Sequence, residues 1–182
     1  MKKYLILLLL SPLALKAQRD GGDFSVSALG GISKKGYNAQ FHVDYYIPYT
    51  YLMVQGRLLY INQNLPTVFD SSINLKQFGF SALLGWSPEK RISHPFFLNF
   101  LAGLSVGYDY GNNGNKVFSD YEMPFDTEKY NKLNYGFVTS VQGEINVSDK
   151  LSLMADFSQF YRFGSEFGKY TYTINGGFKI YL

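Results

Sequence analysis

Short stretches in which apolar and polar residues alternate dominate the chain. The clearest is Tyr170–Leu182, where the even positions read Tyr, Tyr, Ile, Gly, Phe, Ile and Leu. The odd positions read Thr, Thr, Asn, Gly, Lys and Tyr. A period of two places successive side chains on opposite faces of a β-strand. This segment is therefore predicted to be a strand with one apolar face.

The same alternation recurs upstream and predicts eight strands in all. Between the strands lie turn residues such as Ser148-Asp149, which favour tight antiparallel hairpins. An even number of antiparallel strands joined in sequence is typical of an up-and-down barrel. The predicted strands are Phe24–Ile32, Tyr37–Tyr45, Thr50–Ile61, Phe78–Trp86, Phe96–Tyr108, Phe137–Val147, Leu151–Ser158 and Tyr170–Leu182.

The connections between these strands alternate in length. If both chain ends face the periplasm, the periplasmic turns are Ile47–Tyr49, Ser87–Pro95 and Ser148-Asp149. The two longest connections then both face outward. Short periplasmic turns with longer external loops are typical of outer-membrane barrels. The predicted outward loops are Ser33–Gly36, Asn62–Asn74, Tyr110–Lys132 and Gly164–Gly168.

The composition of the polar face decides between a soluble and a membrane barrel. A lipocalin-like barrel has the same alternation with its apolar face inward, and its outer face is rich in Lys and Glu. Here the polar face is mostly Gly, Ser, Thr, Asn and Gln, which fit a crowded lumen. We therefore predict an all-β, eight-stranded antiparallel transmembrane β-barrel of the outer-membrane type. We expect outer-membrane lipid to surround this barrel.

The first residues predict export. Met1-Lys2-Lys3 is followed by a short apolar run and by Ala17, which is the layout of a signal peptide. We expect residues 1–17 to be removed and residues 18–182 to form the barrel, in the outer membrane of a Gram-negative bacterium. Three of the 17 basic residues lie in this segment, which leaves 14 against 14 acidic residues. The basic charge thus gives no reason to expect direct nucleic-acid binding.

Several charged side chains fall on the face predicted to line the lumen. An eight-stranded barrel has an interior just wide enough for side chains to fill, and a buried charge needs a partner. We expect these residues to form a structural polar network, whereas nothing in their spacing supports a proton or ion path. The candidate network is His42, Asp44, Arg57, Glu144, Asp156, Arg162 and Lys179.

Two predicted outward loops carry apolar residues amid polar ones. Such residues either dock onto a partner or fold over the barrel mouth, and both interpretations stay open. The candidate loop contacts are Leu65, Phe69, Tyr121, Met123 and Phe125.

Candidate chemistry is sparse. The chain has two histidines, of which His42 lies in a predicted strand and His94 in a predicted periplasmic turn. Neither has an obvious Ser and acid partner at the outer rim, where lipid-modifying barrels place them. The chain contains no cysteine, no clustered metal ligands and no phosphate-binding glycine motif. We expect no enzymatic activity and no cofactor.

The second half of the chain contains a series of short segments in a characteristic order: Phe97–Phe100 leading into Ala102–Tyr108, then Tyr135-Gly136, Ser148–Leu151 and Gly176–Leu182. In the order and spacing of these segments it resembles the conjugal-transfer protein TraO family of Bacteroidetes conjugative transposons. The resemblance implies an outer-membrane component of a DNA-transfer apparatus that acts through other envelope proteins and has no catalytic motif. The alternative is a stand-alone small barrel for adhesion or envelope stability, and a lipid-modifying enzyme is a third class.

Overall fold

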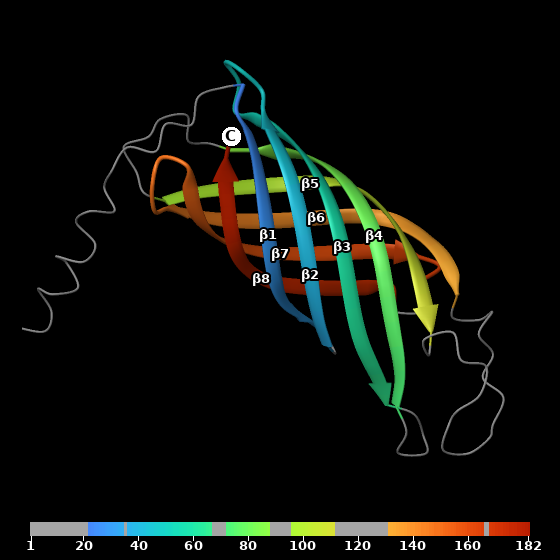
Figure 1. Cartoon of the computed structure of the whole chain (residues 1–182). Helices are drawn as coiled ribbons and strands as arrows, with labels where there is room; N and C mark the ends of the chain where they lie inside the picture. Colours follow the sequence, from blue (N-terminus) through green and yellow to red (C-terminus); the bar gives the residue numbers. More distant parts are fainter. Residues whose placement is uncertain (1–21, 35, 67–71, 88–95, 112–130, 166–167) are drawn as a thin grey trace, which may run out of the picture.

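The computed structural model describes residues 22–34, 36–66, 72–87, 96–111, 131–165 and 168–182. The predicted signal peptide, residues 1–17, lies outside these ranges. In the described part of the chain, no helix is long and apolar enough to cross a membrane. Figure 1 shows the strands wound around one axis. They are β1 (Phe24–Ser33), β2 (Gly36–Tyr46), β3 (Leu52–Pro66), β4 (Ser72–Trp86), β5 (Phe96–Gly111), β6 (Lys132–Asn146), β7 (Leu151–Phe163) and β8 (Tyr170–Tyr181).

The sheet closes on itself. Each strand pairs antiparallel with the next along the chain, and β8 returns to pair with β1. Phe24 lies opposite Tyr45 on β2, while its neighbour Ser25 lies opposite Tyr181 on β8. Closure gives every strand two partners and therefore satisfies the backbone N–H and C=O groups within the barrel. The prediction of an eight-stranded antiparallel up-and-down barrel is confirmed.

The two ends of the barrel differ. The backbone N–H of Leu182 donates a 2.9 Å hydrogen bond to the carbonyl oxygen of Phe24. The end where these residues meet is called the terminal end. It also carries the connections from β2 to β3, from β4 to β5 and from β6 to β7. The opposite end, called the loop end, carries the other four connections.

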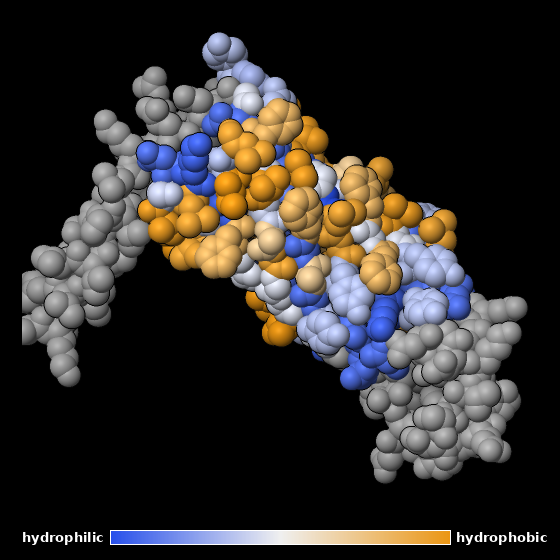
Figure 2. All heavy atoms as spheres, viewed as in Figure 1, coloured by the Kyte–Doolittle hydropathy of each residue, from blue (hydrophilic) through white to orange (hydrophobic). Residues whose placement is uncertain are grey.

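Side chains alternate between the interior and the exterior along every strand. In β8, Thr171, Thr173 and Asn175 are buried, whereas Tyr172 and Ile174 are exposed. The exposed positions are mainly large apolar and aromatic residues, as the predicted outward apolar face requires. Figure 2 shows the result on one face, where an apolar band crosses the barrel and gives way to hydrophilic residues toward the loop end.

Several predicted strands are too short at the loop end. β6 starts at Lys132 and not at Phe137, and β7 runs to Phe163 and not to Ser158. The segment Asn62–Asn74 was predicted to be a loop, but β3 runs to Pro66 and β4 starts at Ser72. Leu65, a candidate loop contact, therefore lies in β3, opposite Ile73. The segment lacks apolar alternation, so the pattern that marks the other strands is missing. Side-chain amides support the pairing instead, since Asn74 Nδ2 donates to Asn62 Oδ1 (2.7 Å) and Asn64 Oδ1 (2.9 Å).

This hairpin extends beyond its neighbours. The pairing of β3 with β2 ends at Gln63, and the pairing of β4 with β5 ends at Leu75. Beyond these residues β3 and β4 pair only with each other, up to Pro66 opposite Ser72. Figure 1 shows the two strands projecting past β2 at the loop end. The projecting part, residues 64–66 and 72–74, is called the β3–β4 projection.

Close approach of neighbouring strands depends on glycine at five described positions, of which Gly103 and Gly177 are two examples. A Cβ at Gly103 on β5 would lie 2.0 Å from the carbonyl oxygen of Ala82 on β4. A Cβ at Gly177 on β8 would lie 2.1 Å from the carbonyl oxygen of Ala28 on β1. Any side chain would force these strands apart. Glycines at such bends allow a sheet to curve tightly enough to close.

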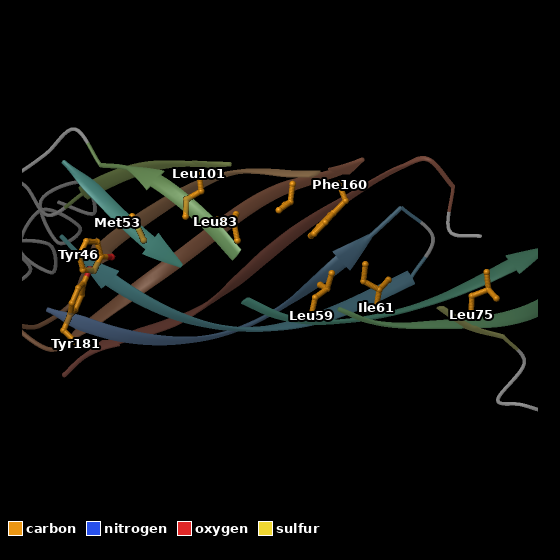
Figure 3. Packing of buried hydrophobic residues seen from close by; sticks show 10 residues of the cluster. Tyr46, Met53, Leu59, Ile61, Leu75, Leu83, Leu101, Phe160 and Tyr181 are labelled. Carbon is orange, nitrogen blue, oxygen red and sulfur yellow. The ribbon is translucent and has the colours of Figure 1, made fainter. Parts of the chain in front are cut away.

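The interior also contains apolar side chains at two levels. Tyr46 and Tyr181 lie together near the terminal end, with ring centroids 6.2 Å apart. Leu59, Ile61 and Phe160 lie further toward the loop end, and the stick view in Figure 3 shows the two groups well separated. The sequence pattern pointed to a polar lumen and did not predict these layers. The polar network described below lies between them.

Candidate functional site in the barrel interior

All seven predicted network residues are buried inside the barrel. The strand alternation places them there, because each occupies an inward position on β2, β3, β6, β7 or β8. Five of them join through side-chain contacts, and two lie apart from that group. The five are Asp44, Arg57, Glu144, Asp156 and Lys179, and the other two are His42 and Arg162.

Lys179 is the centre of the first part of the network. Its Nζ lies 2.8 Å from Asp44 Oδ2 and 2.7 Å from Glu144 Oε1. It also donates a 3.0 Å hydrogen bond to the hydroxyl of Tyr46. The side chains of the lysine and of both carboxylates are fully buried. One ammonium with three donors thus meets three oxygen acceptors, which is its full capacity.

The two carboxylates are bound by further donors. Glu144 accepts hydrogen bonds from Asn99 Nδ2 (2.5 Å) and from the Tyr181 hydroxyl (2.7 Å). Asp44 accepts from Ser25 Oγ at 3.1 Å and from Gln55 Nε2 at 2.7 Å. Charge-assisted hydrogen bonds of this kind offset the loss of hydration on burial.

Arg57 forms the second part of the network. Its guanidinium donates to Ser158 Oγ at 2.5 Å and to Ser140 Oγ at 3.2 Å, and Nη2 lies 3.5 Å from Asp156 Oδ2. The two serine hydroxyls in turn donate to Asp156. The arginine thus reaches from β3 to β6 and β7 across the interior.

Gln55 connects the two parts. Its amide nitrogen donates to Asp44, and its oxygen accepts from Arg57 Nη2 at 2.8 Å. Lys179, Asp44, Gln55, Arg57 and Asp156 are therefore linked in one continuous chain of contacts. Because these side chains extend from β2, β3, β7 and β8 toward one another, the chain crosses the lumen.

His42 lies beside this chain without joining the ion pairs. It is paired in register with Arg57 on the neighbouring strand. Its Nε2 lies 2.9 Å from the amide oxygen of Gln40, and its Nδ1 has no protein partner. Gln40 also donates to Thr173 on β8 at 3.1 Å. A histidine bound to an amide has no acid to activate it for catalysis.

A separate polar group lies near the loop end, around a carboxylate that the sequence analysis missed. Asp109 accepts hydrogen bonds from Gln77, from Asn134 Nδ2 (2.7 Å) and from Ser165 Oγ (2.7 Å). The predicted strand ended at Tyr108, so this residue was assigned to neither face. The sequence does offer one indication. Asp109 directly follows the outward Tyr108, so continuing the alternation by one residue places Asp109 inside the barrel.

Arg162 belongs to this second group. Its guanidinium lies 4.3 Å from the ring centre of Phe160, and Asp109 is the carboxylate that attracts it. Its Nε and Nη1 have no protein hydrogen-bond partner. Phe160 separates Arg162 from Ser158 along β7, so an apolar layer lies between the two polar groups.

The remaining candidates cannot be placed in this site. Phe69, Tyr121, Met123 and Phe125 lie outside the described residues, and so does His94. Among the residues that the structure describes, no group of three or more His, Asp or Glu side chains could hold a metal ion.

Charged side chains fill much of the described interior. The described interior contains three cations (Arg57, Arg162 and Lys179) and four carboxylates (Asp44, Asp109, Glu144 and Asp156). All are shielded from water, and five of them contact one another directly or through Gln55, Ser140 and Ser158. Removing one partner from such a network is destabilising, because it leaves a buried charge without compensation.

Comparisons with known proteins give the fold class. No protein-family model matches the chain, and no curated protein matches it significantly. Among solved structures it is similar to a major outer membrane protein from Thermus thermophilus, with a TM-score of 0.66, 12% identity, and 88% of this chain and 99% of that chain covered. It is also similar to the outer membrane protein OprG from Pseudomonas aeruginosa (TM-score 0.60, 10% identity, 93% and 98% covered) and to Neisserial surface protein A (TM-score 0.59, 11% identity, 88% and 97% covered).

The chain therefore has the fold of the outer-membrane barrels. It is an eight-stranded antiparallel transmembrane β-barrel, with an apolar exterior and a polar, filled interior. At these identities the likeness extends to the fold alone.

Proposed function

We propose that the chain is a stand-alone, non-enzymatic and non-conducting barrel of a Gram-negative outer membrane, serving adhesion or envelope stability. The loop end faces outward in this proposal, and the terminal end faces the periplasm. The observation that carries it is the sealed interior, in which Lys179 and Arg57 bridge strands on opposite sides of the lumen and are fully buried. A side-chain-filled lumen suits an anchor for an outer surface better than a channel.

Conductance tests the closed state. The protein refolded in detergent and added to a planar lipid bilayer is expected to give no current steps. A general porin serves as the positive control, and heat-modifiable gel mobility shows that the sample is folded. Stable current steps from the folded protein would contradict the proposal.

The β3–β4 projection supports an adhesive role. It extends the barrel beyond the apolar band and is braced by the amide contacts of Asn74 with Asn62 and Asn64. A preordered hairpin loses little conformational entropy on binding a partner. Replacing residues 64–74 by a two-residue Asn-Gly turn is expected to reduce attachment of cells to surfaces while the barrel still folds.

Envelope stability is separated from adhesion by a second measurement on the same strains. Loss of the whole chain would increase detergent sensitivity if the barrel stabilises the envelope, and the shortened hairpin would not. Normal attachment and normal detergent resistance in both strains would contradict the proposed function.

A lipid-modifying activity has its best candidate in His42, which is sealed in the interior and bonded to an amide. Cells carrying His42→Ala are expected to keep the lipid A composition of cells carrying the unaltered chain. A changed lipid A composition would instead support the alternative that the protein is a lipid-modifying enzyme.

The transfer role implied by the TraO resemblance stays a prediction. Copurification of the tagged chain from detergent-solubilised membranes tests it. Recovery together with envelope proteins of a conjugative apparatus would support that role, and recovery without them would favour the stand-alone barrel.

A further inference from the structure

An aromatic cluster with one lysine above it lies on the exterior of β6, β7 and β8 at the loop end. Tyr161 is central, with its ring 4.9 Å from that of Phe163 and 5.0 Å from that of Tyr170. Tyr135 adds a fourth ring, 5.5 Å from Phe163. Lys169 Nζ lies 5.0 Å from the centre of the Tyr161 ring. These five residues are called the rim patch.

The backbone holds Lys169 in place. The N–H of Arg162 donates to the carbonyl oxygen of Lys169 at 2.9 Å, which continues the β7–β8 pairing by one step. Gly164 and Gly168 have φ values of 76° and 94°, which glycine adopts without strain. The backbone of Lys169 is therefore held against β7, while its side chain is exposed.

The lysine stays charged. A hydrogen bond with Tyr161 raises the pKa of Lys169 above its ordinary value. A cation over a tyrosine face is also favoured by the ring quadrupole. At any pH where a phosphate group is ionised, the rim patch thus presents a positive charge directly above an apolar, aromatic surface.

Among the described residues of the loop end, the exposed charges on the exterior are cations. The exterior there carries Lys34, Lys76 and Lys169. Among the described residues of this end, the one carboxylate is Asp109, which is buried inside the barrel. The turn between β6 and β7 at the terminal end instead carries an acid and a base next to each other in the sequence, Asp149 and Lys150, both exposed. Exposed lysines at this level complement the phosphate groups of an anionic lipid surface.

We propose that the rim patch binds the headgroup of a phosphorylated lipid, with Lys169 at the phosphate and the acyl chains along the apolar exterior of β6–β8. Aromatic side chains of membrane proteins gather at the headgroup level, which places a phosphate within reach of Lys169. Ile174, Phe157 and Val141, exposed further along the same strands, provide the surface for the chains. This inference rests on the membrane location in the proposed function.

Native mass spectrometry of the refolded barrel in detergent micelles tests the inference. Diphosphoryl lipid A is titrated in, and the fraction of barrel carrying bound lipid is measured. The variant Lys169→Gln is expected to need about fivefold more lipid for half-saturation, the loss expected for one cation near a phosphate. The matched control, Lys150→Gln, removes an exposed lysine at the terminal end and is expected to bind as the unaltered chain does.

Two further arms separate the sources of the phosphate. Lipid A stripped of its phosphates is expected to bind the unaltered barrel as weakly as lipid A binds Lys169→Gln. Inorganic phosphate at the same concentration is expected not to displace the lipid. Displacement by inorganic phosphate would show a general anion site and overturn the lipid assignment.

Equal half-saturation for Lys169→Gln and the unaltered chain would also overturn the inference, as would equal losses in Lys169→Gln and Lys150→Gln. Heat-modifiable mobility of all variants shows that each is folded. The titration in micelles measures lipid binding alone. A folded barrel that fails to bind lipid would therefore contradict this inference but not the proposed function. Failure of the proposed function would appear instead in conductance or in the cell assays.

Discussion

Lys179 on β8 reaches past β7 and places its Nζ 2.7 Å from Oε1 of Glu144 on β6. The same ammonium lies 2.8 Å from Asp44 on β2, so a single cation ties together strands from both sides of the β1–β8 closure. Removing it leaves two buried carboxylates without their counter-charge.

The variant Lys179→Met tests this relationship. Breaking a buried ion pair by removing one partner costs about 3–5 kcal/mol, so we expect a loss of that size in the free energy of unfolding. Urea unfolding of the barrel in lipid vesicles measures it. Lys150→Met, at an exposed turn, is the control and is expected to unfold as the unaltered chain does. Equal midpoints for the two variants would contradict the network.

Gly103 provides a test of the strand curvature. A Cβ there lies 2.0 Å from the Ala82 carbonyl oxygen, so Gly103→Ala must separate β4 from β5 and is expected to cost about 3 kcal/mol. Gly30 is a matched control, because a Cβ at that outward position meets nothing within 4 Å. The test measures and compares the folding yields of Gly103→Ala and Gly30→Ala in lipid vesicles. Similar yields would show that the strands do not approach as described.

Leu104 tests which face meets lipid. It lies halfway along β5 on the exterior and is 63% exposed. A charge at the bilayer midplane on the lipid face of a barrel costs about 2–4 kcal/mol, so Leu104→Arg is expected to lower the unfolding free energy by that amount. Ser148→Arg, in the exposed turn between β6 and β7, is expected to have little effect. A larger loss of unfolding free energy in Ser148→Arg than in Leu104→Arg would indicate that Leu104 faces water and not lipid.

The strand count and the facing of the side chains could be predicted from the sequence because the exterior is apolar along most of each strand. In Tyr170–Leu182 the alternation alone identifies the inward and outward residues. The same rule places Asp44, Arg57 and Lys179 inside the lumen, as the structure has them. Period-two patterning is sufficient wherever one face meets an apolar surrounding.

The prediction fails where that contrast disappears. Asn62–Asn74 contains apolar residues but no regular alternation of apolar and polar positions. Its paired residues are held by backbone hydrogen bonds and by the amide contacts of Asn74, which no hydropathy pattern reports. Asp109 was missed for a related reason, since it lies past the last apolar residue of its predicted strand. The contacts between buried side chains depend on how the strands are staggered around the barrel. Because the sequence does not give this stagger, the link that Gln55 makes between Asp44 and Arg57 could not be predicted.

The central claim, an apolar exterior facing lipid around a sealed lumen, is tested most directly through Trp86. It is the one tryptophan of the chain, lies at the end of β4 on the exterior and is 49% exposed. The barrel is refolded into vesicles containing brominated lipids, and tryptophan fluorescence is recorded. We expect strong quenching by lipids brominated near the headgroup, weaker quenching by those brominated deep in the chains, and little quenching by aqueous iodide. Strong iodide quenching with no effect of either brominated lipid would contradict the account.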